Sequence, residues 1–284
     1  MKIIKYFFQA LVIYVFFIII KILGLNNSRK LFSLFFRKIG FIIKSKKIIY
    51  KNLDKALIPN KEDVIDNMWS NYGMTFVEYM FLKDFKYSNL HININGEEIL
   101  DEINKKMKPV IFVSGHFANF ELMSMELNKH KVNLATVYRP LNNLFLNPFM
   151  EFIRRKYICQ NQIKKGIAGI REIINSLKKN QSIALMVDQR VGEGKRFNFF
   201  NYGAHTTSLP AQLALKNNLN IVPIYISRKK ENKFEMQIYK PIETSKIIDT
   251  EANRNKITLS LNKIIEEMIL RDPGQWIWTH NRWK

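Results

Sequence analysis

The sequence predicts an α/β fold, in which a largely parallel sheet flanked by helices follows an N-terminal membrane-anchoring helix. Three observations lead to this prediction. Short aliphatic runs alternate with segments of helical periodicity. An apolar segment of membrane-spanning length precedes them, and basic residues follow it directly. The hydrophobic fraction of 47% and charged fraction of 24% are those of a folded chain of 284 residues with a large core.

The first apolar segment, Ile3–Leu25, contains no polar residue except Gln9 and lysines near its two ends. Its length comes close to the roughly 20 residues that cross a bilayer as a helix. No small-x-small cleavage site follows Ile20, which argues against a removable signal peptide. We therefore expect an uncleaved transmembrane anchor over residues 1–25, with a helix lying on the membrane surface as the alternative.

A second segment, residues 29–51, mixes aromatic and aliphatic residues with many lysines and arginines. This composition is typical of a helix at the interface of an anionic membrane surface. By the positive-inside rule, basic residues just after the anchor place residues 26–284 on the cytoplasmic side. A solvated basic helix packed on the domain is the alternative.

The charge and cysteine content limit the function classes. The formal net charge of +21 would attract polyanions: nucleic acid, an anionic membrane, or an acidic protein or lipid. No helix-turn-helix or aromatic RNA platform is recognisable, so we expect no nucleic-acid partner. The single cysteine, Cys159, excludes an intrachain disulfide, and the five histidines show no ligand spacing, so we expect no metal.

Alternating elements predict one α/β domain. Helices are expected at about 60–80, 118–127, 167–177, 210–216 and 256–270, and strands at 110–113, 134–138, 182–187 and 221–226. In an open parallel sheet, ligands bind beyond the carboxyl ends of the strands. Polar residues follow three of these strands, which should place His116, Arg139, Asp188 and Arg190 on one rim.

His116 and Glu121 form the sharpest candidate pair. A histidine can remove a proton from a hydroxyl near neutral pH, and a carboxylate can orient the imidazole. Residues five apart on a regular helix point in different directions, so the pair can meet only if His116 precedes the helix and Glu121 lies in its first turns. Gly115 would allow such a turn. A capping histidine and a solvent-facing glutamate are the alternative.

The sequence resembles a known family, the lipid A secondary (lauroyl or myristoyl) acyltransferases, within the wider group of glycerolipid and lipid A acyltransferases that share a His-x4-Asp/Glu signature. The matching motifs are GHFANFE at 115–121, YRPLNN at 138–143, DQ at 188–189, FFNYGAHTT at 199–207 and QWIWTHNRWK at 275–284. The family usually has glycine sooner after the paired phenylalanines than Gly203, and His205 is also unusual there. These departures concern substrate details.

This resemblance implies an O-acyltransferase of lipopolysaccharide biosynthesis at the cell inner membrane, with one membrane pass. The family transfers a fatty acyl chain from acyl carrier protein to a hydroxyl of a lipid A precursor that carries Kdo, without a cofactor. His116 would be the general base and Glu121 its orienting partner. Arg139 and Arg190 would bind phosphate, and Asp188 would hold one of these arginines; for each of the three, a structural ion pair is the alternative role.

Other readings remain open at this stage. The same chemistry could serve another acceptor, such as a mannoside, ornithine-type or aryl lipid. A membrane-tethered nucleic-acid-binding protein is a different class, motivated by the charge of +21. A catalytically silent family member is a third, although His116 and Glu121 are both present.

Overall fold

The computed structural model describes residues 2–192 and 194–284. A seven-stranded sheet forms its centre, with strand order β1-β9-β8-β2-β5-β3-β4. All neighbouring strands run parallel except β8 and β9, which form an antiparallel pair. The prediction of a largely parallel sheet flanked by helices is therefore confirmed. The seven strands are β1 (Ile92–Asn95), β2 (Ile111–Ser114), β3 (Leu134–Tyr138), β4 (Asn161–Lys164), β5 (Ser182–Met186), β8 (Ile221–Arg228) and β9 (Phe234–Ile238).

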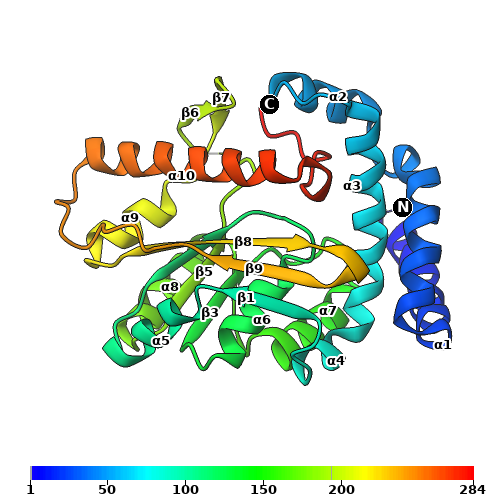
Figure 1. The fold of residues 1–284 in the computed structure, drawn as a ribbon, viewed down its shortest axis with the longest axis horizontal. Helices are drawn as coiled ribbons and strands as arrows, with labels where there is room; N and C mark the ends of the chain where they lie inside the picture. The colour runs from blue at the N-terminus through cyan, green and yellow to red at the C-terminus, as the bar shows by residue number, and fades with distance from the viewer. Residues whose placement is uncertain (1, 193) are drawn as a thin grey trace.

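Helices cover both faces of this sheet, so every residue of the central strands β2 and β8 is buried. One face packs against α3 (Lys61–Glu78), α8 (Ile167–Lys178), α9 (Leu209–Lys216) and α10 (Glu251–Arg271). The other face packs against α4 (Leu82–Lys86), α5 (Glu97–Lys106), α6 (Glu121–Lys129) and α7 (Asn147–Ile153). In Figure 1, α10 crosses one side of the sheet, and α6 and α7 lie on the other. A short hairpin of β6 (Arg196–Phe199) and β7 (Tyr202–His205) stands apart.

The apolar N-terminal segment is helical and folds back on itself. Helix α1 spans Lys2–Ile43, but Gly24 has φ 74° and ψ 170°, which are not helical angles. The rings of Phe16 and Phe32 lie 5.5 Å apart, whereas 16 residues of continuous helix would separate them by about 24 Å. The two halves of α1 are therefore antiparallel, and both lie beside α3 (Figure 1).

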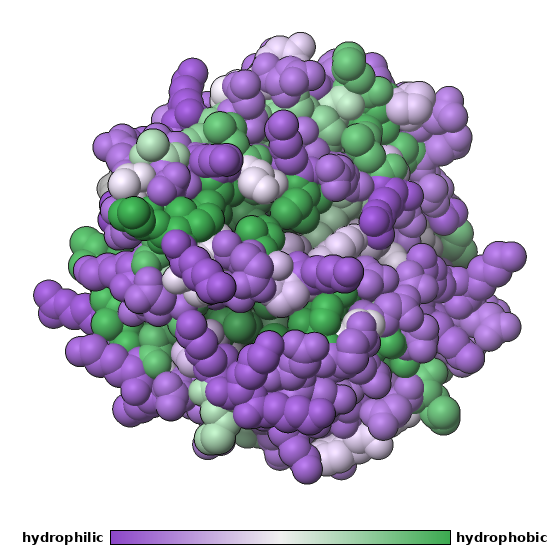
Figure 2. Space-filling view, turned by 60° about the vertical axis from the view of Figure 1, so that its left-hand side comes forward, coloured by the Kyte–Doolittle hydropathy of each residue, from purple (hydrophilic) through white to green (hydrophobic). Residues whose placement is uncertain are grey.

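The first half of α1 keeps an exposed apolar face. Only 17% of its most apolar 18-residue stretch is buried, whereas the core helix of a soluble protein would be mostly buried. The exposed residues recur at helical spacing: Ile3, Ile4, Phe7, Phe8, Leu11, Val12, Val15, Ile18, Ile19 and Ile22. The opposite face packs on the domain, where the Tyr14 hydroxyl donates to the carbonyl of Phe145 at 2.9 Å. The α2 helix (Lys46–Lys55) follows the second half. By contrast, the surface in Figure 2 is largely hydrophilic, with smaller apolar areas between the polar side chains.

Candidate active site

His116 lies in the loop after β2, at the carboxyl edge of the sheet, and is held by Asp188 from the end of β5. Its Nδ1 lies 2.8 Å from Asp188 Oδ1, and its backbone N–H donates to Asp188 Oδ2 at 2.9 Å. An ionised carboxylate can only accept, so the ring carries its hydrogen on Nδ1. In the neutral ring, Nε2 then keeps a lone pair. The imidazole is 18% exposed, and its Nε2 lies 3.4 Å from the side-chain amide of Gln189.

Asp188 is fully buried and stays ionised because three hydrogens point at it. Besides the two from His116, the indole Nε1 of Trp276 donates to Oδ2 at 2.8 Å. Burial alone would raise the pKa of Asp188, but the His116 charge and these hydrogen bonds lower it to about 2. The carboxylate can therefore orient the ring and stabilise an imidazolium when the ring takes up a proton.

The loop that carries His116 has a tightly determined backbone. A side chain on Gly115 would come within 2.7 Å of the Phe117 ring, so this position has no room for one. Ala118 has φ 44°, which is unusual for a residue other than glycine. Its N–H donates to the carbonyl of Gln275 at 2.9 Å, and its own carbonyl accepts from Thr75 at 3.2 Å. Contacts from α3 and the C-terminal segment thus hold a strained turn in place.

Glu121 begins α6, but its carboxylate binds other partners than His116. Its Oε1 accepts from Nε and Nη2 of Arg154, at 2.8 and 2.6 Å, and from the Tyr79 hydroxyl at 2.8 Å. Burial would lower the pKa of Arg154, but the Glu121 charge raises it. His116 does precede the helix, as the spacing required, yet the expected hydrogen bond to Glu121 is replaced by the one to Asp188. The physical reason is that Arg154, on the π turn after α7, offers Glu121 a buried cation.

A second buried ion cluster ties the same loop to the N-terminal helices. Glu78, at the end of α3, accepts from Arg29 of α1 at 2.8 Å and from Arg228 of β8. It also accepts from Nδ2 of Asn119 at 2.9 Å, and Asn119 lies three residues after His116. Burial would raise the pKa of Glu78, but Arg228 and Arg29 hold it below its usual value. The cluster therefore connects α1, α3 and β8 to the loop that carries His116.

The predicted arginines follow the same sheet edge but do not pair with Asp188. Arg139 follows β3 and is exposed. Arg190 is half-buried, and its Nε is buried without a hydrogen-bond partner among the described residues. Its backbone N–H donates to Nε2 of His280 at 2.9 Å, and burial lowers the pKa of that ring to about 4. Asp188 accepts from His116 and Trp276 instead of from an arginine.

The structure adds residues that sequence reasoning did not place here. Lys165 follows β4 at the same edge, and burial together with the charge of Arg139 lowers its pKa. Trp276 belongs to the matching C-terminal motif, which gave a signal for its importance but not for its position. Arg154 and Tyr79 lie in segments without any motif, so no sequence signal identified them.

The chain is similar to known proteins over most of its length. The family model of bacterial lipid A biosynthesis acyltransferases matches residues 1–284. The chain is 25% identical to the lipid A biosynthesis palmitoleoyltransferase of Escherichia coli strain K12 over 254 residues, which cover 86% of this chain and 80% of that protein. It is 24% identical to the lipid A biosynthesis lauroyltransferase of the same organism, with the same coverage. A lipid A biosynthesis acyltransferase of Haemophilus influenzae is 23% identical over 79% of this chain and 71% of its own length. This chain therefore belongs to the bacterial lipid A biosynthesis acyltransferase family.

Proposed function

We propose that the protein transfers a fatty acyl chain from the thioester of acyl carrier protein to a hydroxyl of a Kdo-bearing lipid A precursor. The observation that carries the proposal is the His116–Asp188 pair. Nδ1 of the ring is bound to a buried carboxylate, and Nε2 lies 3.4 Å from the Gln189 amide in a side chain that is 18% exposed. A base of this kind is what activation of a hydroxyl requires. Membership of the family supports the class of acceptor.

In the proposed mechanism, Nε2 of His116 takes the proton of the acceptor hydroxyl as its oxygen attacks the thioester carbonyl. A carbon–oxygen bond forms, the carbon–sulfur bond breaks, and the imidazolium returns the proton to the leaving thiolate. Asp188 stabilises the imidazolium in between. No acyl-enzyme is needed, and Cys159 is an unsuitable nucleophile because burial raises the pKa of its thiol.

Glu121 has a positioning role in this proposal. It holds Arg154 and Tyr79 at the start of α6, directly after the loop that carries His116. Asp188 takes the orienting role that the spacing alone had suggested for Glu121. The two carboxylates can be distinguished by experiment, since only one of them contacts the imidazole.

Basic residues at the sheet edge would bind the phosphates of the substrates. Arg139, Lys165 and Arg190 follow three neighbouring strands, β3, β4 and β5. Guanidinium groups suit phosphate geometry, and the buried Nε of Arg190 lacks a partner among the described residues. The net charge of +21 would also attract an acidic carrier protein.

Residues 1–25 would hold the enzyme at the inner membrane, with residues 26–284 forming the catalytic domain on the cytoplasmic side. The exposed apolar face of α1 and the basic residues after it support this placement. The hairpin at Gly24 is compatible with insertion of the outer face of α1 into one leaflet.

The test is a transfer assay with the detergent-solubilised full chain. Lauroyl or myristoyl acyl carrier protein and a Kdo-bearing lipid A precursor are supplied, and the lipid is read by mass spectrometry. A gain of one acyl chain that disappears in His116→Ala is expected. A gain that persists in this folded variant would refute the general-base role. An intact thioester with no mass gain would refute the lipid A precursor as the acceptor. Whole-cell lipids would then be screened for the lipid that changes when the protein is removed.

A further inference from the structure

We infer that two neighbouring cavities beside α7 form a binding site for one anionic phospholipid, with the phosphate in a basic cavity and an acyl chain in an apolar groove. The inference rests on the proposed membrane placement of the protein. It concerns a region distinct from the residues around His116, because none of the candidate catalytic side chains lines either cavity.

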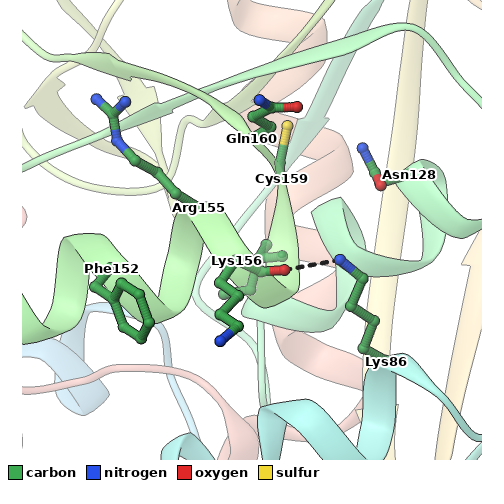
Figure 3. Close-up of a pocket in the computed structure, with 8 residues that line it drawn as sticks. Lys86, Asn128, Phe152, Arg155, Lys156, Cys159 and Gln160 are labelled. Carbon is green, nitrogen blue, oxygen red and sulfur yellow. Dashed lines mark hydrogen bonds between the residues drawn. The ribbon is translucent and has the colours of Figure 1, made fainter.

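The basic cavity has a volume of about 620 Å³ and carries three cations. Its charged lining residues are Lys86, Arg155 and Lys156, and none of its lining residues is acidic. Among the described residues, no carboxylate forms an ion pair with any of the three. Figure 3 shows these side chains around the turn that carries Cys159 and Gln160. Uncompensated cations around a hollow favour an anionic ligand.

The local backbone explains why these cations gather at one place. The π turn Arg154–Ile158 directs Arg154 inward to Glu121, and it leaves Arg155 and Lys156 in the cavity lining. Lys86 reaches across from the end of α4, and its Nζ donates to the carbonyl of Lys156 at 2.7 Å (Figure 3). The amide side chains of Asn128 and Gln160 add neutral hydrogen-bonding groups.

The apolar groove lies where Phe149 of α7 meets the first half of α1, and it has a volume of about 470 Å³. Its lining residues are Tyr14, Phe17, Ile18, Lys21, Ile22, Met80 and Phe149. Lys21 is the only charged residue among them, and its ammonium lies 4.4 Å from the centre of the Phe81 ring. Most of this lining comes from the first half of α1, so the groove is continuous with the exposed apolar face of that helix.

Helix α7 brings the two cavities together. Phe149 lines the apolar groove and Phe152 lines the basic cavity, and residues three apart lie on neighbouring positions of one helix face. Phe152 is 55% exposed, as an aromatic ring at a lipid headgroup would be. A phospholipid matches this arrangement, because its anionic phosphate would lie in the basic cavity and an attached acyl chain in the apolar groove. The arrangement therefore fits a lipid better than an acidic protein.

The experiment is native mass spectrometry of the detergent-solubilised full chain. Dilauroyl phosphatidylglycerol is the anionic probe, and dilauroyl phosphatidylcholine is the zwitterionic comparison. We expect the wild-type chain to retain the anionic lipid preferentially. Neutralising the cavity with Lys86→Gln, Arg155→Gln and Lys156→Gln should weaken retention of that lipid at least about tenfold, because each basic group near a lipid surface contributes.

A matched control removes the same charge elsewhere. Lys131→Gln, Lys178→Gln and Lys179→Gln change exposed lysines, and we expect retention of the anionic lipid within about twofold of wild type. Equal losses in the two triple variants would overturn the site, because net charge alone would then explain them. Unchanged lipid retention with a raised KM for acyl carrier protein would also overturn it, in favour of protein docking. His116→Ala should keep the lipid preference, so failure of the proposed catalysis can be recognised separately.

Discussion

Replacing Asp188 by asparagine should stop catalysis while keeping the fold. Asp188 accepts three hydrogens: Oδ2 takes those of the His116 backbone and of Trp276, and Oδ1 takes that of the His116 ring. The carbonyl oxygen of an asparagine can replace only one carboxylate oxygen. If it takes the place of Oδ2 and keeps two of the hydrogen bonds, its NH₂ group faces Nδ1 of the imidazole. The ring must then carry its hydrogen on Nε2, so the base is lost.

The magnitude follows from this change of tautomer. In a serine protease triad, the same substitution lowers kcat by about 10⁴-fold with the geometry intact. That factor corresponds to about 5.5 kcal/mol of transition-state stabilisation. We expect Asp188→Asn to lower kcat by about 10³- to 10⁴-fold, with little change in KM, because the substitution alters the proton on the ring and not the substrate contacts.

The transfer assay described above measures this loss, and circular dichroism checks that the variant is folded. Glu121→Gln is the matched comparison, because it neutralises the other candidate carboxylate, which contacts Arg154 and not the imidazole. We expect it to lower kcat less than Asp188→Asn does. Activity of Asp188→Asn within tenfold of wild type would refute the reasoning, and the reverse order of the two variants would return the orienting role to Glu121.

Two further predictions concern stability. Glu78→Gln leaves two buried arginines without a counter-charge, so it should lower the free energy of unfolding by about 3–5 kcal/mol in denaturant titrations. The control Glu102→Gln removes a carboxylate from an exposed ion pair and should change the free energy of unfolding by less than about 1 kcal/mol. Equal effects of the two substitutions would contradict the role of burial. His280 has a folded-state pKa of about 4, below its ordinary value of 6.5, so the unfolded chain binds the proton more readily, and stability is lost as the pH falls from about 6.5 to 4. Between pH 7.5 and 5 the wild type should lose about 1 kcal/mol more than His280→Gln, a value reduced for the partial exposure of the ring. Identical pH profiles in thermal unfolding would show that this ring does not titrate as described.

Local patterns in the sequence were sufficient to predict much of the fold. Strands β2, β3, β5 and β8 lie where short apolar runs predicted them, because most of their side chains are buried. The same patterns did not predict strands β1, β4 and β9, because these strands are only partly buried and their sequences contain polar residues. Because strands β2–β5 run parallel, their carboxyl ends meet at one edge, and so His116, Arg139, Asp188 and Arg190 were assigned to one rim from their positions alone.

The partners of these residues depended on tertiary structure. Asp188 lies 72 residues from His116, and Trp276 lies a further 88 residues from Asp188. Spacing within one motif made Glu121 the natural partner of His116, but the folded chain brings Arg154 to Glu121 from 33 residues away. Sequence spacing constrains which residues can meet along one helix, whereas a buried charge takes whichever counter-charge the packing brings near. The fold class could therefore be predicted from local patterns, whereas the carboxylate that contacts the His116 ring was decided only by long-range packing.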